Sequence, residues 1–182
     1  MSSPTADVSV RLAWPADAEA IAHCQVDAWR ESYAGLVPTD LLDGLDPSGF
    51  AAAWSEALTS PKEARARVLV ALERDSVRGF ALVHPSQDPD ADPAVDGEVA
   101  EFIVHPASRG AGHGSRLIQA SIDTMRADKL TRAFWWIGAT DDAMRSFVVS
   151  SGWEPDGAHR ELEGEVGSTL KQVRLHSDLS EN

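Results

Sequence analysis

The stretch VHPASRGAGHGSRLI, residues 104–118, is the most informative part of this chain for its fold. An apolar run from Val99 to Val104 leads into Pro106, and glycines then alternate with other residues before an amphipathic run begins. The pattern predicts a strand, a tight loop and a helix from Ser115 to about Asp128. Such a loop presents free backbone N–H groups at a helix N-terminus, where the partial charge is positive. The segment is therefore predicted to bind phosphate groups.

The spacing of the glycines excludes two common nucleotide loops. The NAD-type fingerprint needs glycine at its first, third and sixth positions, and Gly110, Gly112 and Ser115 fail the last of these. The ATP-type loop ends in Gly-Lys-Ser/Thr, which does not follow here. A glycine-rich turn without a ligand is the alternative to a phosphate site.

The stretch resembles the acyl-CoA loop of the GNAT superfamily of N-acetyltransferases, written Arg/Gln-x-x-Gly-x-Gly/Ala, which here reads RGAGHG from Arg109 to Gly114. Residues 29–38 match a Trp-Arg-x-x-Tyr-x-Gly-x-x-Pro run that one bacterial GNAT group has in its first helix and turn. Residues 141–153 resemble the last shared GNAT segment. Asp141, Val148 and Trp153 stand there in place of asparagine, tyrosine and phenylalanine.

Hydrophobic periodicity predicts alternating strands and helices along the whole chain. Strands are expected at 8–12, 68–73, 77–83, 99–104, 132–138, 152–155 and 168–175, and helices at 17–29, 38–42, 46–58, 115–128 and 141–150. The resemblance implies a GNAT fold of the α/β (α+β) class, a mixed and mostly antiparallel sheet of about seven strands with helices on both faces. It implies a single domain over residues 1–182, with an ordered core from about 8 to 176.

The composition is that of a soluble globular protein, with 43% apolar and 25% charged residues in 182. No apolar run approaches the ~20 residues of a membrane helix, and the N-terminus does not resemble a signal peptide. Cys24 is the only cysteine, which fits a cytoplasmic protein. The six histidines lack paired ligand spacing, so no metal is expected.

The charge balance indicates which partners to expect. With 29 acidic and 16 basic residues the formal charge is −13, which argues against binding to nucleic acid. The same field would attract a cationic amine, although it could equally serve only solubility. Arg109 and Arg116 would supply local positive charge for a polyanionic ligand. Homodimers are frequent among GNAT proteins, so a homodimer is a possible state.

The resemblance implies an acetyl-CoA-dependent N-acetyltransferase that moves an acetyl group to a primary amine of a small molecule or peptide. The alternative is a non-catalytic GNAT-fold module that binds acyl-CoA as a sensor or partner subunit. Acetyl-CoA would be a co-substrate. The residues implied to bind it are Phe102, Ile103, Val104, Arg109, Gly110, Ala111, Gly112, His113, Gly114, Ser115 and Asp141.

Acetyl transfer needs a neutral amine, and a primary amine with a pKa near ~10.4 is almost wholly protonated at pH 7, so a general base helps. The resemblance points to Glu98 as that base, with Glu101 as the second candidate. Residues three apart on a regular strand face opposite sides, so only a bulge would bring both to one site. Either could also be a solvated strand residue. The backbone N–H of Val104 is expected to polarise the thioester carbonyl.

Trp29 and Tyr33 are implied to contact the acceptor, and with Trp54 they could form an aromatic wall or simply belong to the core. The superfamily often uses a tyrosine to protonate the departing thiolate, and Val148 occupies its position. Ser150, a water molecule or no group at all could take that role. The sequence does not indicate the acceptor, the length of the acyl chain or the oligomeric state.

Overall fold

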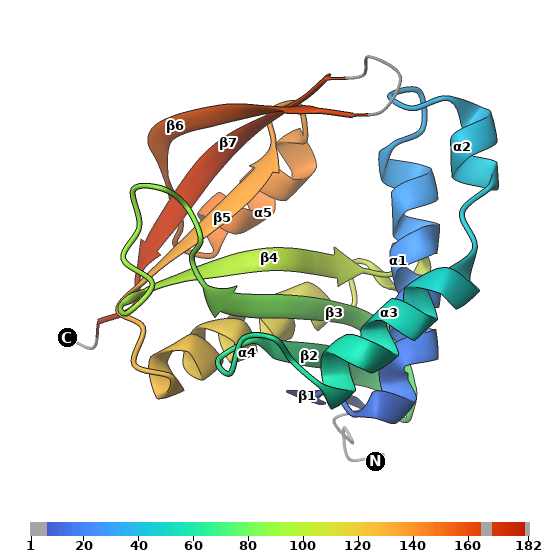
Figure 1. The fold of residues 1–182 in the computed structure, drawn as a ribbon, viewed down its shortest axis with the longest axis horizontal. Coiled ribbons are helices and arrows are strands. Elements are labelled where there is room, and N and C mark those ends of the chain that lie inside the picture. The colour runs from blue at the N-terminus through green and yellow to red at the C-terminus, as the bar shows by residue number, and fades with distance from the viewer. Residues whose placement is uncertain (1–6, 165–168, 181–182) are drawn as a thin grey trace, which may run out of the picture. The chain divides into compact units, whose positions relative to one another are not determined.

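The computed structural model describes residues 7–164 and 169–180, and Figure 1 shows the course of the chain. Its elements follow the predicted order. They are β1 (Val8–Leu12), the 3₁₀ turn η1 (Pro15–Asp17), α1 (Ala18–Ser32), α2 (Thr39–Asp43), α3 (Pro47–Thr59), β2 (Arg67–Glu73), β3 (Ser76–Pro85), β4 (Asp96–Val104), η2 (Pro106–Ser108), α4 (His113–Ala127), β5 (Arg132–Gly138), α5 (Asp142–Ser150), β6 (Glu154–Glu163) and β7 (Thr169–Asp178).

The seven strands form one sheet in the order β1-β2-β3-β4-β5-β7-β6. β1 pairs with β2, β5 with β7, and β6 with β7 in antiparallel fashion, whereas β4 and β5 are parallel. A parallel pair needs a crossover connection, and α4 lies between these two strands in the chain. The predicted seven-stranded mixed sheet of the α/β class is confirmed.

Two strand predictions need correction at the C-terminal end. The stretch expected as a short strand over 152–155 is β6, which has ten residues and begins at Glu154. A register shift between Pro155 and His159 interrupts its pairing with β7, which explains why the period-two pattern is weak there. β7 extends to Asp178, and the predicted strand start at Ser168 lies outside the described residues.

The chain divides into two compact units. The first runs to Leu82 and includes Glu101–Ser121, and the second comprises Val83–Ala100 with the chain from Ile122 onward. In the first unit, Asp17 fixes the start of α1: its carboxylate accepts a hydrogen bond from the Trp14 N–H at 2.7 Å and forms an ion pair with Arg11 at 2.7 Å. These contacts stabilise the start of the helix that the sequence pattern predicted from residue 17.

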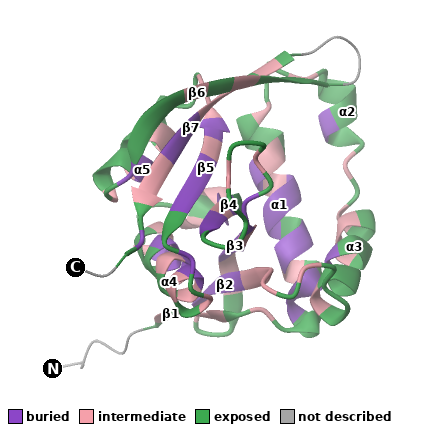
Figure 2. Ribbon diagram, turned by 60° about the vertical axis from the view of Figure 1, so that its left-hand side comes forward, coloured by how far each residue is buried: buried purple, intermediate pink, exposed green. Residues whose placement is uncertain are grey.

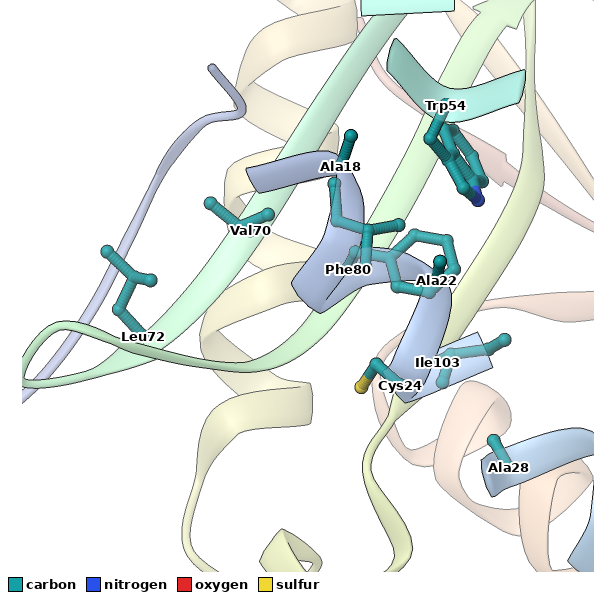
Figure 3. Packing of buried hydrophobic residues seen from close by; sticks show 10 residues of the cluster. Ala18, Ala22, Cys24, Ala28, Trp54, Val70, Leu72, Phe80 and Ile103 are labelled. Carbon is teal, nitrogen blue, oxygen red and sulfur yellow. The ribbon is translucent and has the colours of Figure 1, made fainter. Parts of the chain in front are cut away.

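The core of the first unit forms around the apolar face of α1, which Figure 2 shows as a buried stripe. Ile21, Ala22 and Val26 have no exposed surface, and burying a side chain as large as isoleucine or valine stabilises the fold by roughly 1.5–3 kcal/mol. Figure 3 shows the cluster to which Ile21 and Ala22 belong. Its members are Ala18, Ile21, Ala22, Cys24, Ala28, Trp54, Val70, Leu72, Phe80 and Ile103.

In the second unit, Trp153 is buried and packs edge-on against Trp135, with ring centroids 5.4 Å apart. The chain end is also anchored here, contrary to the expectation that order stops near residue 176. Leu179 is buried, its N–H donates to the Thr131 carbonyl at 2.8 Å, and its own carbonyl accepts from Arg126 at 2.9 Å. Among the described residues, no helix is long and apolar enough to cross a membrane.

Arg174 is a buried charged residue of the second unit, and it holds the loop after β3. Its guanidinium contacts Asp88 at 3.1 Å, Asp90 at 2.7 Å and Asp156 at 2.6 Å. The indole N–H of Trp136 also donates to Asp88, at 2.9 Å. The aspartate-rich loop after β3 is therefore fixed by charge-assisted hydrogen bonds.

Candidate functional site

β4 leads directly into the glycine-rich loop, as predicted. At its end, the His105 N–H donates to the Arg78 carbonyl at 2.7 Å, and the turn η2 follows. Gly110 and Gly112 then have φ values of +78° and +84°, a left-handed conformation that favours glycine. α4 begins at His113, two residues before the predicted start. The loop therefore needs its glycines for the backbone path itself.

This loop fits a phosphate-bearing ligand. The first N–H groups of α4 have no intrahelical acceptor and carry the positive end of the helix dipole. A Cβ added at Gly110 would meet open space, and one at Gly112 would lie 2.7 Å from the Arg116 Nη1 atom. That nitrogen donates to the Gly112 carbonyl at 3.4 Å, so a cation lies beside the loop.

Two residues of the loop pair with carboxylates on α1. The Nε2 atom of His105 lies 3.1 Å from Asp27 Oδ2, while His105 Nδ1 accepts from the Ala107 N–H at 3.1 Å. Arg109 forms an ion pair with Glu31, one turn further along the same helix. Sequence reasoning missed both carboxylates, although their spacing places them on one face of α1.

Glu101 on β4 carries a carboxyl group whose pKa differs strongly from its ordinary value. Burial raises the pKa of its carboxyl group to about 7. The pKa of the Tyr33 phenol is raised as well, mainly by burial and additionally by the charge of Glu101. The two side chains are therefore close enough to interact electrostatically, which places a carboxyl with a pKa near neutrality beside an aromatic residue predicted to contact substrate.

Trp29 and Tyr33 meet edge-on, with ring centroids 6.0 Å apart, and Trp29 meets Phe50 in the same way at 5.4 Å. Trp29 packs against the core cluster, whereas Trp54 belongs to it and donates its indole N–H to Gln25 at 2.7 Å. Trp54 is therefore a core residue. Tyr33 and Trp29 form a half-buried aromatic pair at the end of α1.

The remaining predicted residues divide between loop and strand. Phe102 and Ile103 are buried and Val104 is half-buried, while Arg109, Ala111 and Ser115 are exposed. Gly114 lies in the first turn of α4. His113 is buried, and its two ring nitrogens have no hydrogen-bond partner among the described residues. Desolvation lowers the pKa of His113, so its imidazole is neutral at pH 7.

Three predicted positions lie in the second unit. Glu98 is half-buried and accepts a hydrogen bond from the Ser86 hydroxyl at 3.2 Å. Asp141 caps α5, since its carboxylate accepts from the Met144 N–H at 3.0 Å. Val148 is fully buried in α5 and offers no proton donor. Its burial explains why an apolar residue is stable at this position.

The described residues contain no group of three or more histidine, cysteine, aspartate or glutamate side chains that could hold a metal ion. Cys24 is buried, and that burial, with the charge of Asp27, raises the pKa of its thiol to about 12. The thiol therefore stays protonated at neutral pH and does not act as a nucleophile.

Comparisons with known proteins identify the family of the chain. Residues 18–153 match the model of the acetyltransferase (GNAT) family. The chain is 24% identical over 168 residues to the uncharacterized N-acetyltransferase YuaI of Bacillus subtilis (strain 168), covering 92% of this chain and 91% of that protein.

Solved structures show the same fold. The structure of yncA from Salmonella typhimurium with its cofactor acetyl-CoA has a TM-score of 0.70 and 21% identity, covering 97% of this chain and 96% of that one. Ribosomal-protein-alanine N-acetyltransferase from Brucella melitensis has a TM-score of 0.72 and 22% identity, covering 93% and 99%. With its glycine loop at the end of β4 and the family match across most of its length, the chain belongs to the acetyltransferase (GNAT) family and is an acyltransferase.

Proposed function

We propose that this acyltransferase uses acetyl-CoA to acetylate a primary amine of a small molecule or peptide. The observation that carries the proposal is the carboxyl group of Glu101, whose pKa of about 7 suits a general base at neutral pH. It lies on β4 three residues before Val104, where the strand runs toward the glycine-rich loop. Solved relatives of the same fold hold acetyl-CoA or coenzyme A, which supports the choice of co-substrate.

The loop and α4 would hold the pyrophosphate of acetyl-CoA. The N–H groups of Gly110, Gly112, Gly114 and Ser115 would donate to its oxygens. Because the side chains of Phe102 and Ile103 are buried, this part of β4 would contact acetyl-CoA through its backbone. The N–H of Val104 would then stabilise the negative charge that develops on the thioester oxygen.

Glu101 would accept the proton of the incoming ammonium group, directly or through a water molecule. The neutral nitrogen attacks the thioester carbon, the C–S bond breaks, and the thiolate leaves. Valine stands at position 148, where the family resemblance expects a tyrosine, and it cannot donate a proton, so we take solvent as the proton source for the thiolate. Tyr33 and Trp29 would orient the amine beside Glu101, where the ring faces can also attract its cationic form.

Glu98 is the other carboxylate to which the family resemblance points. Its carboxylate accepts a hydrogen bond from the Ser86 hydroxyl at 3.2 Å, within the second unit. We assign proton transfer to Glu101 because burial raises the pKa of its carboxyl group to about 7. The net charge of −13 favours a cationic acceptor. We also propose a reducing compartment such as the cytoplasm, on the ground of the unpaired, buried Cys24.

The direct test is release of coenzyme A thiol, measured with acetyl-CoA and a panel of primary amines that includes polyamines, amino acids and peptides with free N-termini. Propionyl-CoA and a long-chain acyl-CoA are run in parallel to establish the acyl group. Amine-dependent thiol release with acetyl-CoA supports the proposal. Tight acetyl-CoA binding without release for any amine would instead favour the non-catalytic sensor.

A further inference from the structure

We infer that two carboxylates of α1, Asp27 and Glu31, act in opposite directions on acetyl-CoA binding. Asp27 positions the phosphate loop, and Glu31 restrains the loop's cation. The inference rests on the proposed binding of acetyl-CoA by this loop. Both carboxylates lie on the same unit as the loop, and each pairs with a different loop residue.

Asp27 acts through the imidazole of His105. The Nδ1 atom of His105 accepts from the Ala107 N–H, so the ring proton must lie on Nε2, the nitrogen that faces Asp27 at 3.1 Å. The carboxylate therefore fixes both the tautomer and the orientation of the ring. The ring in turn caps η2, the turn that leads to Arg109 and the glycines. Without Asp27, the imidazole is free to rotate or to exchange its proton, and the start of the loop loses a fixed hydrogen bond.

Glu31 acts on Arg109 itself. The two charged groups form an ion pair in which each side chain is about half exposed, at 53% and 50%. Arg109 is the first residue of the acyl-CoA loop pattern, where a guanidinium would pair with phosphate oxygens. Before it can bind a phosphate, that guanidinium must break its ion pair with Glu31 or contact Glu31 and the phosphate at the same time. Glu31 therefore competes with the ligand and lowers its affinity.

Net charge alone predicts a different effect of removing Asp27 on acetyl-CoA binding. Removing either carboxylate takes one negative charge from the surroundings of a polyanionic ligand, so both changes would strengthen binding. A positioning role for Asp27 predicts weaker binding after its removal, despite the more favourable charge. The two residues lie one turn apart on α1, so their distances from the loop are similar enough for the comparison to be direct.

The experiment is calorimetric titration of acetyl-CoA into the wild type and the variants Asp27→Ala, Glu31→Ala and Glu19→Ala. Glu19 is an exposed carboxylate at the other end of the same helix and serves as the matched control. Asp27→Ala is expected to weaken binding by about fivefold, roughly the net value of one ordinary hydrogen bond. Glu31→Ala is expected to strengthen binding by about threefold relative to the wild type. Raising the salt concentration should reduce this difference, but not the difference between Asp27→Ala and the wild type.

A second measurement separates positioning from loss of stability. Asparagine at position 105 can accept from the Ala107 N–H without help from Asp27, so His105→Asn should make binding insensitive to Asp27→Ala. The KM for acetyl-CoA should change in Asp27→Ala while the KM for the amine does not. Equal or stronger binding by Asp27→Ala, or an unchanged penalty in the His105→Asn background, would overturn the inference. Lack of acetyl-CoA binding by the folded wild type would instead overturn the proposed function.

Discussion

The Tyr33 phenol lies within electrostatic reach of the Glu101 carboxyl, and the negative charge of Glu101 adds to burial in raising the pKa of the phenol. Burial alone raises the pKa of Glu101 to about 7. A carboxyl in such a site changes its protonation near neutral pH, where proton transfer from an ammonium group is most useful. The relationship joins the predicted acceptor contact and the proposed base in one part of the fold.

Glu101→Gln should reduce kcat by about 100-fold or more and leave the dissociation constant of acetyl-CoA unchanged, because only proton transfer is lost. In the wild type, kcat/KM should rise with pH through about 7, the pKa of Glu101, and the variant should lack that inflection. Glu98→Gln, on the same strand, is the matched control and should keep it. An inflection that persists in Glu101→Gln and disappears in Glu98→Gln would transfer the base role to Glu98.

The same carboxyl makes stability depend on pH. Its pKa is 4.5 in the unfolded chain and about 7 when folded, so the folded state binds the proton more tightly. Stability is therefore full below pH 4.5 and is lost as the pH rises to 7, by up to about 3 kcal/mol. Glu101→Gln should unfold at a higher temperature than the wild type at pH 8 and at a similar one at pH 4.5. Thermal denaturation that shows the same difference at both pH values would contradict this.

His113 should make the protein sensitive to acid. Burial lowers the pKa of its imidazole, so the unfolded chain binds a proton that the folded state refuses. Stability is then full above about 6.5 and falls as the pH drops below that value. His113→Leu removes the titrating group and both unpartnered nitrogens, and it should be increasingly more stable than the wild type from pH 7 to pH 5. Urea denaturation at several pH values measures this; a constant difference would show that His113 does not titrate there.

Gly112→Ala should weaken acetyl-CoA binding about tenfold or more while the protein stays folded. The new Cβ would lie 2.7 Å from the Arg116 guanidinium, at a φ of +84° that alanine avoids, so the loop has to change its path. Gly49→Ala is the control, because a Cβ at this helical position meets open space. Calorimetric titration of both variants checks the prediction. Equal affinity in the two would mean that the loop does not hold the ligand.

Arg174→Met should destabilise the second unit by about 3 kcal/mol, because it removes the ion-pair partner of Asp156 and leaves Asp88 with only the Trp136 indole and the more distant Arg160. Lys171→Ala is the control: it removes an exposed ion pair between β7 and Glu161 on the paired strand β6. It should change the free energy of unfolding by no more than ~0.5 kcal/mol. Chemical denaturation of both variants gives the comparison. Similar losses in the two would show that burial adds nothing to the Arg174 network.

Local patterns predicted the elements whose signals lie within a few residues. The strand into Pro106, the glycine loop and the helix of α4 follow from steric rules and period, and the structure agrees within three residues. β6 was predicted too short because its pairing with β7 is irregular and its outward side chains are polar. Leu179 was missed because its burial depends on Thr131 and Arg126, which are distant in sequence.

The site residues divide in the same way. The glycines carry their own signal, since few other residues adopt the backbone of Gly110 and Gly112. The raised pKa of Glu101 depends on burial by residues far away in the chain, and no local pattern distinguishes it from Glu98. The bond between Asp27 and His105 joins residues from different elements, so it could be found only after folding.

The measurement closest to the central claim is calorimetric titration of the purified protein with acetyl-CoA, with ATP and NAD as controls. The site predicts selective binding of acetyl-CoA in the micromolar range, because the loop after β4 fits a pyrophosphate but lacks the spacing of either nucleotide loop. Absence of acetyl-CoA binding to protein shown to be folded would contradict the account.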